Sequence, residues 1–314
     1  MPETEFYLQD SPEEKEDKVK TKKKPVKKQE QKGINLYTGE ELSTAETRLV
    51  TYRHKTTLIL IVGEYDSGKT TFLATYLERF QQQPFEDFLF AGSTTLIGFE
   101  RRCHLSRLSS NLNKPKTPKT PSTEFSFLHL AVKQKSQLEK GIMHLLISDV
   151  SGERIKRARN SSSEMKQLSL LKRADYIIVM IDGEKLADKK LRYQVILEAQ
   201  TFLKMALDVN VIGAESNVNV IISKWDKIHS DDSFNYQSLI KTPFETRFAQ
   251  LLNRLEFSEV ASRPEADTDE IKDGFGLEPL LSKWCTEQKN TNNPIMFTKT
   301  SAGDLRYFNN YHLK

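Results

Sequence analysis

The most constraining feature of this sequence is the motif Gly63-Glu64-Tyr65-Asp66-Ser67-Gly68-Lys69-Thr70, which lies between an apolar run at 57–62 and a helical pattern at 69–81. An apolar strand that leads into a glycine-containing loop and then a helix is the setting of a phosphate-binding P-loop. Backbone N–H groups of the loop would surround the β-phosphate, Lys69 would bridge the β and γ oxygens, and the Thr70 hydroxyl would bind Mg²⁺. The glycines permit close approach, and the helix N-terminus favours negative charge. The residues assigned to phosphate binding are Gly63, Asp66, Ser67, Gly68, Lys69, Thr70 and Thr71.

Strands and helices alternate along the rest of the chain. Several expected strands are continuous apolar runs, such as 176–181 and 218–222, and such runs are typical of a parallel sheet covered by helices on both faces. The expected fold is α/β, with a doubly wound, mostly parallel sheet flanked by helices. We place strands at about 57–62, 125–132, 142–149, 175–181, 218–223 and 295–299, and helices at about 69–81, 163–173, 188–206 and 244–256.

The composition is that of an ordinary globular protein, with 37% hydrophobic and 29% charged residues in a chain of 314. No apolar run approaches the roughly 18 residues of a membrane helix, and the N-terminus lacks the basic and apolar regions of a secretion signal. We therefore expect a cytoplasmic protein. Cys103 and Cys285 are far apart and show no metal-ligand spacing, so neither a disulfide framework nor a zinc site is indicated.

The N-terminal part of the chain differs in composition from the rest. It carries a run of lysines at 18–32 after an acidic patch and almost no aromatic residues, so we expect it to be disordered. Contact with nucleic acid or an anionic membrane is one interpretation of these lysines, but we favour a solvated leader. Further on, Ser43-x-x-Glu46 resembles a capping box that opens a short helix. The expected parts are a Lys-rich tail at 1–34, an extension at 35–55, and a P-loop domain at 56–314 with loop insertions at 107–123 and 258–275.

A second motif follows the strand expected at 142–149. The segment Asp149-Val150-Ser151-Gly152 gives the pattern D-x-x-G at a strand end. In a P-loop protein the Asp149 carboxylate can hold Mg²⁺ through water, and Gly152 can offer its backbone N–H to the γ-phosphate because it has no Cβ. Ligands of doubly wound sheets gather at the carboxyl ends of the strands, so we expect this motif beside the P-loop.

A third motif, Ser223-Lys224-Trp225-Asp226, ends the next apolar strand and is a variant of the N/T-K-x-D pattern of guanine recognition. Asp226 can accept two parallel hydrogen bonds from N1–H and the exocyclic amine of guanine, while the Lys224 stem lies along the ring. Adenine lacks that donor pair and would leave the carboxylate unpaired, at a cost of about 1 to 3 kcal/mol or more.

A fourth motif, Thr300-Ser301-Ala302-Gly303, follows the strand expected at 295–299. It matches the S-A-x box, in which the backbone at Ser301 and Ala302 would contact the guanine carbonyl. Only residues 304–314 follow it, so we expect the usual closing helix to be missing or very short.

The four motifs, in this order, resemble the Ras-like, TRAFAC-type P-loop GTPases over about residues 56–305. The segments 60–71, 90–104 and 149–153 look more specifically like the bacterial double-GTPase proteins associated with conflict and antiphage gene clusters. This resemblance implies a Ras-like fold, a prokaryotic source and a defence-linked system of several proteins.

A GTPase of this kind needs a threonine whose hydroxyl reaches Mg²⁺ and the γ-phosphate in the triphosphate state. Thr94 and Thr95 are the candidates, and the resemblance favours Thr95. Glu153 stands just after D-x-x-G, where the attacking water is oriented; an ionised carboxylate cannot donate a hydrogen bond, so slow turnover is expected. Arg101, Arg102 and Arg154 are candidates for an internal arginine finger, the alternative being one supplied by a partner. The residues assigned to hydrolysis are Lys69, Thr95 and Glu153, and those assigned to the metal are Thr70, Asp149 and Thr95.

The sequence thus favours a protein that binds Mg²⁺ with GTP or GDP, hydrolyses GTP slowly and acts as a nucleotide-dependent switch. Two alternatives are open. The first is a nucleotide-bound scaffold that does not hydrolyse GTP, which the carboxylate at Glu153 would allow. The second is an ATP-using P-loop NTPase, which the guanine-type motif with Asp226 disfavours. The expected partners are unidentified, co-encoded effector proteins. A second copy of the chain, paired in a nucleotide-dependent manner, is a further expectation.

Overall fold

The structure is a computed structural model that describes residues 38–82, 85, 87–104, 125–139, 141–231, 233–265, 268 and 270–286. All of these residues belong to one compact unit, Tyr37–Lys314. Several expectations therefore lie outside the described residues: the tail at 1–34, the insertion at 107–123, the strand at 295–299, and the box with Ser301 and Ala302.

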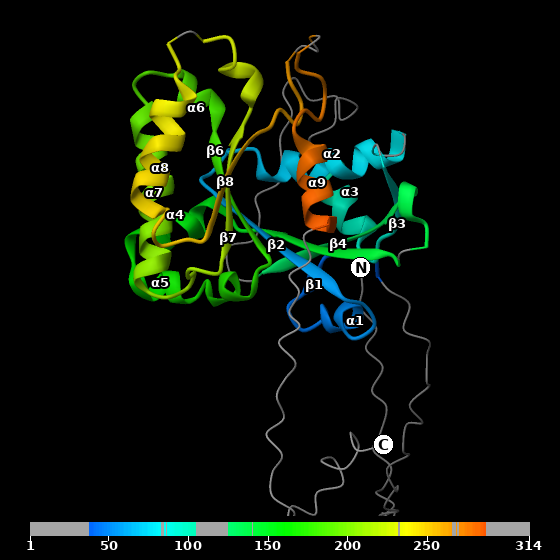
Figure 1. Cartoon of the computed structure of the whole chain (residues 1–314). Coiled ribbons are helices and arrows are strands. Elements are labelled where there is room, and N and C mark those ends of the chain that lie inside the picture. The colour runs from blue at the N-terminus through cyan, green and yellow to red at the C-terminus, as the bar shows by residue number, and fades with distance from the viewer. Residues whose placement is uncertain are drawn as a thin grey trace, which may run out of the picture. The chain divides into compact units, whose positions relative to one another are not determined.

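A single eight-stranded sheet forms the centre of the described domain (Figure 1). Its order is β1-β4-β5-β2-β6-β7-β8, and β3 pairs with β4. Strands β5, β2, β6, β7 and β8 are parallel to one another, whereas β4 is antiparallel to β5, β1 and β3. The strands are β1 Leu42–Ser43, β2 Thr56–Gly63, β3 Phe88–Gly92, β4 Ser126–Gln134, β5 Met143–Asp149, β6 Tyr176–Asp182, β7 Asn217–Ser223 and β8 Arg254–Glu259.

Helices cover both faces of the sheet and enclose two separate hydrophobic cores. Leu60 and Val62 of β2 point into the core under α4, α5, α7 and α8, while Ile59 and Ile61 point into the core under α2, α3 and α9. This alternation is the period of two that a strand imposes on its side chains. The helices are α1 Arg48–Thr51, α2 Lys69–Gln82, α3 Leu96–His104, α4 Gly152–Asn160, α5 Ser162–Lys166, α6 Gly183–Ala187, α7 Arg192–Asp208, α8 Thr242–Phe248 and α9 Leu277–Thr286, with shorter 3-10 or π turns at Lys135–Gln137, Ser169–Arg173, Trp225–Lys227 and Gln237–Lys241.

The predicted α/β fold is confirmed, since a mostly parallel sheet is flanked by helices on both sides (Figure 1). The capping contacts expected near Ser43 are also present, because Glu46 accepts hydrogen bonds from the Ser43 amide at 2.8 Å and the Ser43 hydroxyl at 2.7 Å. The helix itself begins five residues later, at Arg48. None of the described helices is long and apolar enough to cross a membrane.

The helix expected at 244–256 is wrong in its second half. Helix α8 ends at Phe248, and Arg254–Glu259 forms strand β8, which pairs in parallel with β7. The helical spacing of Phe248 and Leu252 is real, and both side chains are buried. After Leu252, pairing with a strand more than thirty residues earlier outweighs the local pattern.

The structure contains a helix that was not predicted, α9, whereas residues 304–314, where a closing helix was expected to be missing or very short, lie outside the described residues. Helix α9 follows β8 and packs on α2, where the Tyr76 hydroxyl donates a 2.7 Å hydrogen bond to the Leu277 carbonyl. Trp284 lies edge-on to Phe72 and beside Tyr76, and it is 1% exposed. The segment expected as an insertion at 258–275 therefore contains the end of β8 and its connection to α9.

Candidate functional site

The loop at 63–70 joins the carboxyl end of β2 to the N-terminus of α2. A Cβ added at Gly63 would lie 2.8 Å from both the Met180 carbonyl oxygen and the Ser67 hydroxyl oxygen, so only glycine lets the loop close against β6. Gly68 has φ +84° and Asp66 has φ +66°, both in the left-handed region. The first amides of α2, including those of Lys69, Thr70 and Thr71, face out of the helix without intrahelical acceptors. This is the backbone geometry of an anion cradle.

Lys69 is held inside this loop by oxygen atoms. Its Nζ donates to the Gly63 and Glu64 carbonyls, each at 2.8 Å, and to the Ser67 hydroxyl at 3.4 Å. Burial lowers the pKa of Lys69 to about 8, although the Glu64 charge opposes that shift. A phosphate at the mouth of the loop would supply the negative charge that this buried ammonium favours.

Glu64 connects the loop to the helix layer below it. Arg159 of α4 donates to the Glu64 carboxylate at 2.6 Å and lies 3.3 Å from Glu198 of α7. Burial raises the pKa of Glu64, and the Arg159 charge counteracts this. The loop is therefore anchored to two helices by one arginine that the sequence motifs did not indicate.

Thr70 and Asp149 meet as expected from the first two motifs. The Thr70 hydroxyl donates a 3.3 Å hydrogen bond to Asp149 Oδ2, and the Asp149 side chain is buried. One hydroxyl and one carboxylate beside a phosphate cradle fit Mg²⁺, which commonly takes one or two carboxylates, retains several waters and binds phosphate oxygens. Asp149 Oδ1 is bound by the Arg102 guanidinium, a contact that the sequence did not predict.

The N-terminus of α4 lies against the P-loop. A Cβ on Gly152 would come within 2.3 Å of the Tyr65 amide nitrogen, so a side chain at this position is sterically excluded. Ser151 caps the helix by accepting from the Arg154 amide at 3.3 Å. Glu153 is exposed in the first turn of α4. Its role in hydrolysis stays a prediction.

Thr95 is fully buried and forms hydrogen bonds with β4 and within its own loop. Its hydroxyl accepts from the His129 amide at 2.8 Å and donates to the His129 carbonyl at 3.4 Å. The neighbouring Thr94 amide donates to His129 Nδ1 at 3.0 Å, and His129 Nε2 lies 3.0 Å from His144 Nδ1. Burial lowers the pKa of His129 to about 4, so this imidazole is neutral at neutral pH. Thr95 as a metal ligand stays a prediction.

The three arginines proposed as internal fingers have different environments. Arg101 is exposed and pairs with Glu40 at 2.8 Å. Arg154 is buried, donates to the Gln167 carbonyl at 3.2 Å and stacks on Phe125 at 4.4 Å. Arg102, by contrast, hydrogen-bonds Asp149, a residue of the predicted site.

The guanine motif follows β7 at the same edge of the sheet. Lys224 has φ +48°, and its Nζ pairs with Asp182 at 3.2 Å and Glu184 at 2.8 Å. Burial opposes the Lys224 charge, but these two carboxylates raise its pKa above the usual value. Asp226 is partly exposed and accepts a weak 3.4 Å hydrogen bond from the Glu265 amide.

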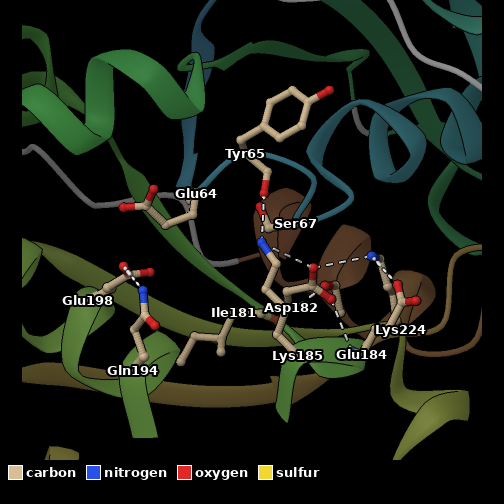
Figure 2. Close-up of polar contacts among 12 residues, drawn as sticks. Glu64, Tyr65, Ser67, Ile181, Asp182, Glu184, Lys185, Gln194, Glu198 and Lys224 are labelled. Atoms are coloured by element: carbon tan, nitrogen blue, oxygen red, sulfur yellow. Dashed lines mark hydrogen bonds and ion pairs between the residues drawn. The ribbon is translucent and has the colours of Figure 1, made fainter. Parts of the chain in front are cut away.

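The residues around Asp182 were not identified from the sequence. Figure 2 shows Lys185 extending from α6 to the P-loop, where its Nζ donates to the Tyr65 carbonyl at 3.1 Å beside Asp182. Asp182 also caps α6 by accepting from the Glu184 amide at 3.0 Å. The acidic end of β6 therefore connects the phosphate loop to the Lys224 loop.

The carboxyl end of β8 supplies a segment beside the guanine motif that was not identified from the sequence. The Trp225 amide donates to the Val260 carbonyl at 3.1 Å, and the Val260 amide donates to Ile222 at 2.8 Å, so 260–262 lies directly beside the Lys224–Asp226 loop. In the sheet order this is the strand next to β7, where a fourth nucleotide-contacting loop is expected. The available signal was the short run Glu259-Val260-Ala261-Ser262 after the alternating residues Leu255 and Phe257.

Comparisons with known proteins found one matching family model and several similar solved structures. The family model Double-GTPase 2 matches residues 57–285. No curated protein matches the chain. Similar solved structures include the signal recognition particle receptor SRb-GTP/SRX complex from Chaetomium thermophilum, at 15% identity and TM-score 0.42, covering 74% of this chain and 97% of that one. The S. cerevisiae Ski7 GTPase-like domain, bound to GTP, is similar at 14% identity and TM-score 0.42, covering 78% of this chain and 53% of that one.

The match runs from β2 to α9 and therefore includes the P-loop, the D-x-x-G motif, the Lys224–Asp226 loop and β8. The box at 300–303 lies beyond it. Since the family model covers well over half of the sequence, this chain belongs to the Double-GTPase 2 family.

Proposed function

We propose that this protein binds guanine nucleotides with Mg²⁺, hydrolyses GTP slowly and acts as a switch between its GTP-bound and GDP-bound states. The observation that supports this most is the placement of four loops, after β2, β5, β7 and β8, at the carboxyl edge of one parallel sheet. The first two carry phosphate and metal chemistry and the last two carry base chemistry. Parallel strands of an α/β sheet bring ligands to this edge.

In this proposal the phosphates lie on the P-loop amides, with Lys69 leaving its loop carbonyls for the β and γ oxygens. Thr70 and Asp149 would hold Mg²⁺, which when bound neutralises charge on the phosphate oxygens. The amide of Gly152 would donate to the γ-phosphate. Asp226 would accept from the guanine edge, and the backbone at 260–262 would contact its carbonyl.

Base recognition is tested by binding measurements on the wild type and Asp226→Asn. We expect wild type to bind GTP far more tightly than ATP, because adenine cannot donate to the carboxylate. An asparagine side chain has one acceptor and one donor, which complement N1–H and the C2 carbonyl of xanthine. Asp226→Asn should therefore lose GTP affinity and gain XTP affinity, while an unaltered preference for GTP would refute the guanine site.

A second candidate, a nucleotide-bound scaffold that does not hydrolyse GTP, is favoured by one observation. Glu153 is an exposed carboxylate next to the phosphate side of the site, where it cannot donate a hydrogen bond to the attacking water. Multiple-turnover assays of wild type and Glu153→Gln separate the two functions. We expect slow turnover that increases in the variant; GTP binding without turnover in either protein would favour the scaffold.

The output and partners are proposals that depend on the family resemblance. A role in a bacterial antiphage system, beside co-encoded effectors, is consistent with the double-GTPase motifs. Capture of co-encoded proteins by the chain loaded with a non-hydrolysable GTP analogue, compared with the GDP-loaded chain, tests it. Self-association is tested by measuring mass in solution in the same two states.

A further inference from the structure

Arg102 of α3 is a buried cation with three acidic or polar partners from three other segments. Its side chain is 7% exposed. The guanidinium forms a hydrogen-bonded ion pair with Asp149 at the end of β5 and with Glu41 in the segment before β1. Its Nη2 also donates to Glu41 Oε2 at 2.7 Å and to the Ser126 hydroxyl at 2.9 Å. One side chain therefore joins the predicted metal carboxylate to the N-terminal extension.

The charges at this junction make Arg102 a competitor for a metal ion. Asp149 Oδ1 faces the guanidinium, and Oδ2 accepts from Thr70, the other predicted metal residue. A divalent cation held by Thr70 and Asp149 would place two positive groups on one buried carboxylate, and their repulsion is strong where solvent screening is weak. Tighter binding of the metal must therefore weaken the contact between Arg102 and Asp149.

Glu41 provides the alternative site for the guanidinium. Burial raises the pKa of Glu41, but the hydrogen bond and charge of Arg102 lower it by more. The net pKa lies below the usual value, so this carboxylate is ionised at neutral pH. An arginine that loses Asp149 can thus remain paired with Glu41 and Ser126. A buried charge that keeps a partner avoids the large penalty of an unpaired one.

The extension and α3 are closely packed against each other. The Gly98 amide donates to the Gly39 carbonyl at 2.9 Å. A Cβ on Gly98 would lie 2.8 Å from the Glu41 amide nitrogen, and one on Gly39 would lie 3.0 Å from Ile97. A shift of α3 that accompanies displacement of Arg102 would therefore be passed to the segment 39–43 through these contacts.

We propose that Arg102 and Mg²⁺ are alternative cationic partners of Asp149, and that their exchange transmits nucleotide binding to α3 and the N-terminal extension. This inference rests on the proposed Mg²⁺-dependent binding of guanine nucleotides. It assigns Arg102 a positioning role on the metal carboxylate in place of an arginine finger. It also gives the residues 39–51 a function as the element that reports the nucleotide state.

The test measures how fast a fluorescent GDP analogue dissociates from the full chain at increasing Mg²⁺ concentrations. The midpoint is the Mg²⁺ concentration at which the slowing of dissociation is half of its maximum. Arg102→Gln removes the competitor and should lower this midpoint about tenfold, which corresponds to about 1.4 kcal/mol. Arg101→Gln is the matched control, since the neighbouring Arg101 side chain is 71% exposed and pairs with Glu40. Its midpoint should equal that of wild type.

A second pair of variants keeps the buried arginine and is expected to shift the Mg²⁺ midpoint in the opposite direction. Glu41→Gln leaves the guanidinium with Asp149 as its remaining carboxylate, so the midpoint should rise, whereas Glu40→Gln should leave it unchanged. Hydrogen exchange supplies an independent measurement. Adding Mg²⁺ and GDP should change amide protection over 39–51 in wild type and in Arg101→Gln, but not in Arg102→Gln.

Equal midpoints in Arg102→Gln, Glu41→Gln and wild type would overturn the inference while leaving guanine-nucleotide binding intact. Unchanged protection over 39–51 in wild type would overturn the transmission step. If wild type binds GDP without any dependence on Mg²⁺, the competition is refuted although the guanine site stands. If wild type binds no guanine nucleotide, the proposed function and this inference fail together.

Discussion

Gly183 is a strong test of how the Lys224–Asp226 loop, proposed to bind the base, is positioned, because the Gly183 backbone packs against that loop without contributing a side chain. It is the first residue of α6, and a Cβ built there lies 2.2 Å from the Ser223 carbonyl oxygen and 2.7 Å from that of Lys224. Real Cβ atoms essentially never approach a heavy atom more closely than 3.0 Å. Gly183→Ala must therefore move the start of α6 and the loop apart by at least 0.8 Å, the difference between 3.0 and 2.2 Å.

That displacement is enough to break the contacts proposed for Asp226. Charge-assisted hydrogen bonds of about 2.8 Å would lengthen to about 3.6 Å, beyond the range in which they are hydrogen bonds. Losing one of them costs about 1.5 to 3 kcal/mol. We expect Gly183→Ala to weaken GTP binding about 10- to 100-fold. The phosphate contacts should be affected much less.

Calorimetry with GTP and ITP measures this effect on the base alone, since ITP lacks the exocyclic amine. Wild type should prefer GTP, and in Gly183→Ala the two affinities should converge. Gly213→Ala is the control, because a Cβ at Gly213 meets no atom within 4 Å. If Gly183→Ala is folded and keeps both the GTP affinity and the GTP-to-ITP ratio of wild type, the reasoning from loop position is refuted.

Three further outcomes are expected. Nucleotide binding near pH 9 should take up a proton, because burial lowers the pKa of Lys69 to about 8 in the free protein and bound phosphates would raise it. Nucleotide affinity should then fall as the pH rises through the pKa of Lys69 in the bound state. Calorimetry in buffers of different ionisation enthalpy measures the proton uptake, which should be absent in Lys69→Arg. Because the pKa of His129 falls from 6.5 to about 4 on folding, the unfolded chain binds more protons in this window, and stability should drop by about 1.6 kcal/mol between pH 6.5 and 5. Denaturant unfolding at both pH values measures it, and an equal drop in His129→Gln would assign it to other groups. Gly152→Ala should weaken fluorescent GDP binding about tenfold by pushing its Cβ into the Tyr65 backbone, and unchanged affinity would contradict this contact.

The sequence predicted best where function depends on residues close together in the chain. The P-loop, the D-x-x-G motif and the Lys224–Asp226 loop each follow a strand whose apolar run is visible locally, and all three occur at the predicted strand ends. The continuous apolar runs along β6 and β7 predicted the parallel sheet for the same reason. Their mutual proximity then follows from topology, without knowledge of any long-range contact.

The features that were missed depend on contacts between distant segments. Strand β8 is specified by its partner β7, and its local pattern merges with the helical spacing before it. The segments β3 and α3 have short, mixed patterns, and they are ordered by pairing with β4 and by Arg102. No motif indicates that an arginine at position 102 would face Asp149, because that pair joins residues 47 positions apart.

Because α9 packs on α2, the loop at 63–70 that precedes α2 depends for its support on the last helix of the described chain. Helix α2 begins at Lys69, and its buried aromatic side chains Phe72 and Tyr76 are covered by Trp284. A nonsense or frameshift mutation before Leu277 would leave those rings facing water. Such a product would carry every residue proposed to bind phosphate and would still be a poor nucleotide binder and prone to aggregation.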